Sequence, residues 1–87
     1  MPKRRHNLES TEENSAITRY YLRTLEPYKL NERERTAALM TIKGHTQKEI
    51  ASSLNVSEST VKLTLRSLYG KLHVKGKSEF LDKFALY

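Results

Sequence analysis

One stretch, HTQKEIASSLNVSESTVK (residues 45–62), limits what this chain can fold into more than any other. It holds two helix-start signals, because Thr46 and Ser57 are both favourable N-cap residues. Only Asn55 and Val56 separate the two helical patterns. Asparagine tolerates the left-handed conformation that a tight turn needs. The stretch therefore predicts two helices joined by a short turn of fixed geometry.

The second helix of the pair, residues 57–72, has one apolar side and one basic side. Its apolar residues recur at intervals of four, three and four, which places them on one stripe: Val61, Leu65, Leu68 and Leu72. The opposite side has no acidic residue and carries Ser59, Lys62, Leu63, Arg66, Ser67 and Gly70. A slim basic face of this kind fits the major groove of DNA, which admits one helix. Leu63 would there meet a thymine methyl, although single exposed leucines without a role are common.

Two helices joined by such a turn form a helix-turn-helix unit. Ala51 is small where the two helices must approach closely, and the contacts between them are expected from Ile50, Leu54, Val56 and Val61. In this unit the first helix rests on the DNA backbone while the second enters the groove.

The remaining periodic segments also read as helices. Apolar residues share one side of residues 14–25, which Asn14 or Ser15 caps and Pro27 ends: Ile17, Tyr20, Tyr21 and Leu25. A capping box, Asn31 with Glu34, starts the next helix, and Gly44 ends it. Its expected apolar face is Leu39, Met40 and Ile42, and Ser78 is expected to cap a last helix with Phe80, Leu81, Phe84 and Leu86.

No strand pattern occurs, so the predicted fold is all-α: a four-helix helix-turn-helix domain with an additional N-terminal helix. Residues 1–13 read as disordered or a linker, 14–29 as the N-terminal extension helix, and 30–87 as the DNA-binding domain. Tyr20, Tyr21 and Tyr28 either cover the core of that domain or form a docking surface. We favour the first interpretation, because a small chain gains much from each buried aromatic residue.

Charge and composition narrow the classes of partner that the chain is expected to bind. The formal net charge is +6, and residues 59–78 hold five basic residues and no acidic one, which favours an anionic partner such as nucleic acid. The chain has no cysteine, and its histidines are scattered at His6, His45 and His73. We therefore expect no metal site, no cofactor and no enzyme activity. No signal sequence or apolar run of about 20 residues is present, so a cytoplasmic location is expected.

From Leu30 onward the sequence resembles the LuxR/FixJ-type DNA-binding domain. The matching positions, in order and without a gap, are Leu30, Arg33, Glu34, Gly44, Thr46, Glu49, Ile50, Ala51, Leu54, Val56, Ser57, Thr60, Val61, Lys62, Lys71, Leu72, Val74 and Glu79. The resemblance implies a four-helix domain whose third helix reads the major groove and whose fourth helix often mediates dimerisation. Three positions depart from the family pattern: Thr64 replaces a usual histidine, and Ala37 and Ala38 replace larger apolar residues.

The resemblance also assigns site residues, position by position. It implies base contacts by Lys62, Leu63 and Arg66. It implies phosphate contacts by Thr46, Lys48, Ser57, Ser59, Thr60, Lys75 and Lys77, several of them at helix starts, where free backbone N–H groups favour anions. It implies dimerisation through Phe80, Leu81 and Phe84.

The expected function is a bacterial transcription regulator, or its DNA-binding effector domain, that binds duplex DNA sequence-specifically as a dimer through residues 57–72. RNA polymerase is a further expected partner, as is a sensor or receiver domain if the chain is a fragment, including a fragment of a membrane-anchored regulator. The alternative is a module related to region 4 of sigma factors, acting mainly through protein contacts.

Overall fold

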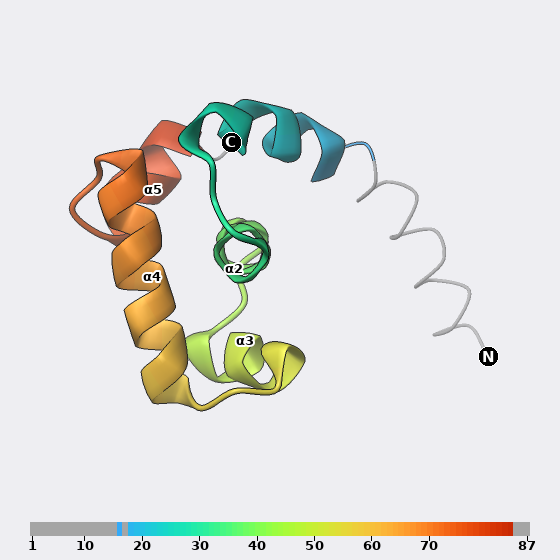
Figure 1. The fold of residues 1–87 in the computed structure, drawn as a ribbon, viewed down its shortest axis with the longest axis vertical. Coiled ribbons are helices and arrows are strands. Elements are labelled where there is room, and N and C mark those ends of the chain that lie inside the picture. The colour runs from blue at the N-terminus through green and yellow to red at the C-terminus, as the bar shows by residue number, and fades with distance from the viewer. Residues whose placement is uncertain (1–15, 17, 85–87) are drawn as a thin grey trace.

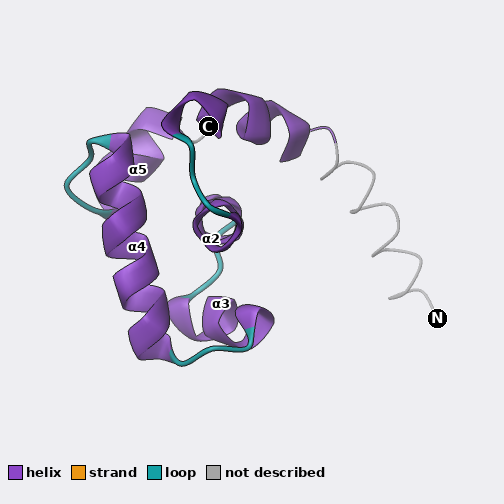
Figure 2. Cartoon of the chain, in the orientation of Figure 1, coloured by secondary structure: helices purple, strands orange, loops and turns teal. Residues whose placement is uncertain are grey.

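The computed structural model of the chain describes residue 16 and residues 18–84. All regular structure in this part is helical, which confirms the predicted all-α fold (Figure 2). Its elements are a helix over residues 18–25, the 3₁₀ turn η1 (Glu26–Tyr28), α2 (Glu32–Ile42), α3 (Gln47–Leu54), α4 (Glu58–Leu72) and α5 (Lys77–Phe84). The predictions for residues 1–13, for the caps Asn14 and Ser15, and for Ile17 and Leu86 lie outside the described residues.

Helix α2 lies at the centre of the arrangement. Figure 1 shows it end-on, with the helix over residues 18–25 and η1 on one side, α3 on the opposite side and α4 running alongside. Helices α3 and α4 both pack against α2 and against each other, and α5 packs against α4. The longest helix, α4, is therefore supported along its length by the other elements.

Helices α2, α3 and α4 begin at the predicted caps. The Asn31 side chain accepts a hydrogen bond from the Glu34 backbone N–H at 2.7 Å, and the Glu34 side chain accepts one from the Asn31 backbone at 3.0 Å. Thr46 and Glu49 form the same reciprocal pair at the start of α3. Ser57 caps α4 by accepting from the Thr60 N–H at 3.1 Å. These bonds satisfy backbone donors that the first turn of a helix leaves unpaired.

Three helices end on a residue in the left-handed conformation. These residues are Gly44 after α2 (φ 93°), Asn55 after α3 (φ 61°) and His73 after α4 (φ 61°). After α3, the Val56 N–H donates back to the Ala51 carbonyl at 3.0 Å, which is the six-to-one bond of a Schellman motif. The predicted stops at Gly44 and Asn55 are thus confirmed, and α4 ends at Leu72 as predicted, with His73 following it in the left-handed conformation.

The predicted apolar stripe of α4 is confirmed, because all four of its residues are buried in the core: Val61, Leu65, Leu68 and Leu72. The N-terminal helix covers the same core with Tyr21, which is 1 % exposed, and Leu25. Tyr28 stacks edge-to-face on Phe84, with ring centroids 5.9 Å apart. Tyr20 departs from the prediction, since it is 49 % exposed, although its ring makes an edge contact with the Tyr21 ring.

Two further predictions need correction. The buried face of α2 is formed by Glu34, Ala37, Ala38, Thr41 and Ile42, while Leu39 and Met40 are only partly buried. Ser78 does not cap the last helix, because it is the second residue of α5. The Gly76 carbonyl accepts the first helical bond, from the Phe80 N–H at 2.9 Å.

Candidate nucleic-acid interface

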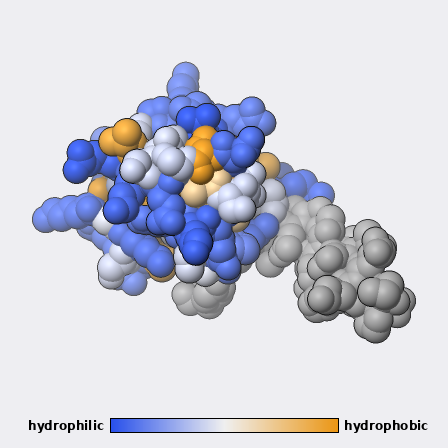
Figure 3. Space-filling model, turned by 90° about the horizontal axis from the view of Figure 1, so that it is seen from below, coloured by the Kyte–Doolittle hydropathy of each residue, from blue (hydrophilic) through white to orange (hydrophobic). Residues whose placement is uncertain are grey.

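The outer face of α4 is held away from the core by the buried stripe behind it. Lys62, Leu63 and Arg66 are all exposed there, and Leu63 keeps 65 % of its surface. The acidic residue of α4, Glu58, lies in the first turn of the helix. Figure 3 views the molecule from the end that carries α3 and the turn into α4, and this face is mostly hydrophilic with small apolar patches. The three residues predicted to contact bases therefore share one free, basic surface.

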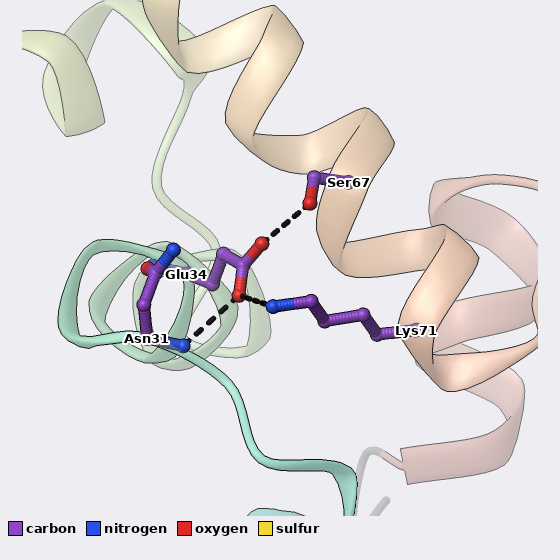
Figure 4. A network of polar contacts seen from close by, with 4 residues as sticks. All are labelled: Asn31, Glu34, Ser67 and Lys71. Atoms are coloured by element: carbon purple, nitrogen blue, oxygen red, sulfur yellow. Dashed lines mark hydrogen bonds and ion pairs between the residues drawn. The ribbon is translucent and has the colours of Figure 1, made fainter.

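Ser67 belongs to this outer face by sequence, but its hydroxyl is engaged elsewhere. It donates to the Glu34 carboxylate at 2.5 Å, and the Lys71 ammonium donates to the same carboxylate at 2.8 Å (Figure 4). Glu34 is buried and also accepts from the Asn31 backbone. One carboxylate thus ties the start of α2 to the middle and end of α4, which fixes the rotation of α4 about its own axis.

The charge of this carboxylate is maintained in the folded state. Burial by itself raises the pKa of Glu34, but its hydrogen-bond donors and the charge of Lys71 outweigh burial and lower that pKa below its ordinary value. Glu34 is therefore a charged, fully bonded link between two helices rather than a free acid.

The residues predicted to contact phosphate lie at the starts of α3, α4 and α5 and in the loop before α5. Lys48, Ser57 and Ser59 are exposed and Thr60 is partly buried, while the Ser57 and Thr60 hydroxyls lie 3.1 Å apart. Thr46 is exposed at the start of α3, where its backbone N–H donates to Glu49. This bond and the His45 ring, 3.3 Å from the carboxylate, lower the pKa of Glu49. The Glu49 carboxylate thus already accepts a hydrogen bond from one backbone N–H at the start of α3, where a phosphate was predicted to bind.

A cavity of about 530 Å³ brings the two predicted basic sets together. Its lining includes Lys62 and Arg66 from α4, Lys75 from the loop that leads into α5, and Lys77 from the first position of α5. Sequence analysis did not single out Thr41, which also lines this cavity from the end of α2. Nothing in the sequence around Thr41 distinguishes it from an ordinary core-facing threonine.

The three residues predicted for dimerisation differ in how deeply they are buried. Phe80 and Phe84 are buried inside this protomer, where Phe80 stacks against Tyr69 and Phe84, so neither has free surface to offer a partner. Leu81 is only partly buried. Thr64, the residue at the usual histidine position, is also buried.

The described residues contain no group of three or more histidine, cysteine or acidic side chains placed to hold a metal ion. Among the helices described here, none is long and apolar enough to cross a membrane.

The capped turn, the supported helix and its basic outer face define the class of helix-turn-helix DNA-binding domains. Residues 28–84 match the family of bacterial regulatory proteins named luxR, and this match covers most of the chain. The chain therefore belongs to the luxR family of DNA-binding transcription regulators.

A relative in Escherichia coli (strain K12) is YhjB, whose name describes an HTH-type transcriptional regulator. The two sequences are 42 % identical over 50 residues, which are 58 % of this chain and 25 % of YhjB. The chain thus spans about a quarter of the length of this relative. No solved structure gives a significant match to the chain.

Proposed function

We propose that the chain is a bacterial transcription regulator, or the DNA-binding effector part of one, that reads duplex DNA with α4 in the major groove. The observation that carries this proposal is the exposed outer face of α4, with Lys62, Leu63 and Arg66 free and no acid among them. The buried stripe and the Glu34 link support it, because they hold this face in one orientation.

Each of the three residues has a separate part in this proposal. Arg66 suits a guanine, whose two acceptors in the major groove match the paired donors of a guanidinium. Lys62 donates to a base acceptor or to a phosphate. Leu63 contacts the methyl group of a thymine, which explains an apolar side chain left 65 % exposed on a basic face.

The residues predicted to contact phosphate lie on either side of α4. They would position this helix on the DNA backbone and would carry no sequence information of their own. Phosphates on one flank would contact the starts of α3 and α4, through Thr46, Lys48, Ser57, Ser59 and Thr60. On the other flank, Lys75 in the loop before α5 and Lys77 at the first position of α5 would contact the DNA backbone. Because the capping hydroxyls already accept backbone bonds, their contact with phosphate would be by donation of the hydroxyl hydrogen.

A dimer on two half-sites completes the proposal. Leu81 supplies the partly exposed part of α5 at such a contact, while Phe80 and Phe84 hold α5 in place from inside the protomer. Membership of the luxR family supports a receiver or sensor domain and RNA polymerase as further partners. The proposed location is the cytoplasm, where chromosomal DNA lies, including the cytoplasmic side of a membrane-anchored regulator.

The double change Lys62→Ala and Arg66→Ala tests the proposal. We expect it to weaken binding to a selected duplex by at least about thirtyfold, because each base contact of this kind is worth roughly 1–3 kcal/mol. Fluorescence anisotropy measures the affinity, and circular dichroism checks that helicity is retained.

Arg19→Ala with Arg23→Ala is the charge-matched control, since both arginines are exposed on the N-terminal helix. It removes the same charge away from α4, so it should change affinity only slightly. Equal DNA affinities for the two double variants would contradict the proposal that α4 reads the major groove. They would favour the alternative, a module that acts mainly through protein contacts.

A further inference from the structure

A second cationic surface lies on the N-terminal helix, apart from α4. Arg19 and Arg23 are exposed there, and this helix and α3 lie on opposite sides of α2 (Figure 1). Four positions separate the two arginines, so their side chains are neighbours on one face of the helix. Like charges at this spacing destabilise a helix slightly, and neither arginine forms an ion pair with another described residue. A carboxylate from outside the chain would relieve this repulsion.

The cationic face of this helix continues into a groove. Arg23 lines a small hollow on the helix, and it also lines a groove of about 370 Å³ between the helix and the start of α2. Of the described residues that line the groove, Lys29 and Arg35 are also cationic and Glu26 is acidic, so a surplus of positive charge remains. We define the N-terminal surface as these cations and the neighbouring aromatic residue: Arg19, Tyr20, Arg23, Lys29 and Arg35.

Apolar surface accompanies this charge. Tyr20 and Leu63 are the two large hydrophobic residues exposed in the described part of the chain. Leu63 has a place in the proposed DNA interface, whereas Tyr20 has none. The partly buried Leu22 and Leu30 contribute to the lining of the groove. A ligand of the N-terminal surface should therefore present apolar groups together with anionic ones.

The residue types of the N-terminal surface favour a protein partner over nucleic acid. Arginine and tyrosine are enriched at the centres of protein–protein interfaces and among their hot spots, whereas lysine is depleted. Three of the four cations here are arginines, while lysines predominate in the proposed DNA interface. A guanidinium also pairs with a carboxylate through two parallel hydrogen bonds. A second copy of this chain is a poor partner, because its net charge is +6.

We propose that the N-terminal surface docks an acidic segment of a partner protein. Aspartate or glutamate side chains of this segment pair with Arg19 and Arg23, and an apolar side chain packs against Tyr20 and the groove. The contact lies away from Lys62 and Arg66, so the chain would hold this partner and DNA at the same time. Docking of the acidic segment does not depend on the proposed function, whereas simultaneous binding does.

The first arm of the test is a titration of the ¹⁵N-labelled full chain at physiological salt, followed by its amide signals. The probes are a short peptide of glutamate and leucine, the same peptide with glutamine for glutamate, and a peptide of glutamate and serine. We expect the glutamate–leucine peptide to shift the signals of residues 19–24 and 29–35, and to bind at least about fivefold more tightly than either control. Equal binding of the glutamate–serine peptide would show attraction of charge alone and would overturn the proposal, as would shifts confined to residues 59–70.

The second arm uses Arg19→Ala with Arg23→Ala, in which alanine preserves the helix. This double variant should bind the glutamate–leucine peptide at least about fivefold more weakly, because both carboxylate contacts are lost. Lys62→Ala with Arg66→Ala is the matched control, since it removes the same charge from α4 and should change peptide affinity by less than about twofold. Equal weakening by the two double variants would mean that net charge alone attracts the peptide, and it would contradict the proposal.

The third arm repeats both double variants with a labelled duplex in place of the peptide. The arginine variant should keep its DNA affinity. If it instead loses affinity for the duplex and not for the peptide, the N-terminal surface is a nucleic-acid contact and the proposal is wrong. Peptide binding at residues 19–24 in a chain that binds no duplex would remove the proposed function and keep the docking surface.

Discussion

Glu34 links two helices through one buried carboxylate. Its carboxylate accepts from the backbone at the start of its own helix and from Ser67 and Lys71 on α4. The buried side chain has no solvent to replace a lost donor. Truncating the charge at this position would therefore affect both the start of α2 and the orientation of α4.

Glu34→Gln tests this at neutral pH. We expect the free energy of unfolding to fall by about 1.5–2 kcal/mol, the lower part of the range for hydrogen bonds to charged groups. The lower part applies because Lys71 is 40 % exposed, and water compensates it when the ion pair is lost. Urea unfolding gives the value, and Glu32→Gln, an exposed change on the same helix, should cost little.

The difference should depend on pH in a defined direction. The pKa of Glu34 is lowered by folding, so its contribution is fully present above the ordinary carboxyl pKa and is lost as the pH falls below it. The wild-type protein and the Glu34→Gln variant should thus converge in stability in acid. A gap between them that stays constant down to about pH 3 would show that the carboxylate charge is not what holds the two helices.

At the scale of elements, the backbone of each helix decides which substitutions it tolerates. Gly70 lies inside α4, and a Cβ built there meets no heavy atom within 4 Å. Gly44 ends α2 with a φ of 93°, which side chains rarely adopt. The same substitution should therefore act in opposite directions at the two positions.

Gly70→Ala should raise the free energy of unfolding by roughly 0.5–1 kcal/mol, because alanine loses less backbone entropy in a helix. Gly44→Ala should lower it by at least about 1 kcal/mol, because of the left-handed conformation. Thermal or urea unfolding of both variants and of the wild-type protein measures these changes in the free energy of unfolding. A stabilising change at Gly44 or a destabilising one at Gly70 would mean that these helices are placed differently.

The sequence predicted those elements whose signal is local. Capping residues fixed the starts of α2, α3 and α4, and apolar spacing identified the buried side of α4. The buried face of α2 was missed in part, since Ala37, Ala38 and Thr41 are small or polar and give little periodic signal. The link from Glu34 to Ser67 and Lys71 joins residues more than thirty positions apart, and nothing in local spacing indicates it.

The candidate site also has a part that the sequence predicted and a part that it did not. Its basic residues were assigned by resemblance, and the structure places Lys62 and Arg66 beside Lys75 and Lys77 around one cavity. That convergence depends on how α4 and the following loop fold back on α2. It could therefore not be read from the chain alone.

At the scale of the whole molecule, the N-terminal helix completes the core. Tyr21→Ala should lower the free energy of unfolding by about 3–4 kcal/mol, as truncation of a fully buried aromatic residue does. Tyr20→Ala, the neighbouring change at a half-exposed ring, should cost about 1 kcal/mol or less. Urea unfolding compares the two, and equal effects would mean that this helix does not pack on the domain.

The central claim, that the chain reads duplex DNA with α4, is tested most directly by anisotropy on a random duplex pool titrated with salt, followed by selection of the tightest-bound fragments. We expect affinity to fall on the order of a thousandfold between 50 and 200 mM salt, as for six or more phosphate contacts. Selection should return an inverted repeat with half-sites spaced for a dimer. Absence of binding at low salt, or binding without any selected sequence, would contradict the claim.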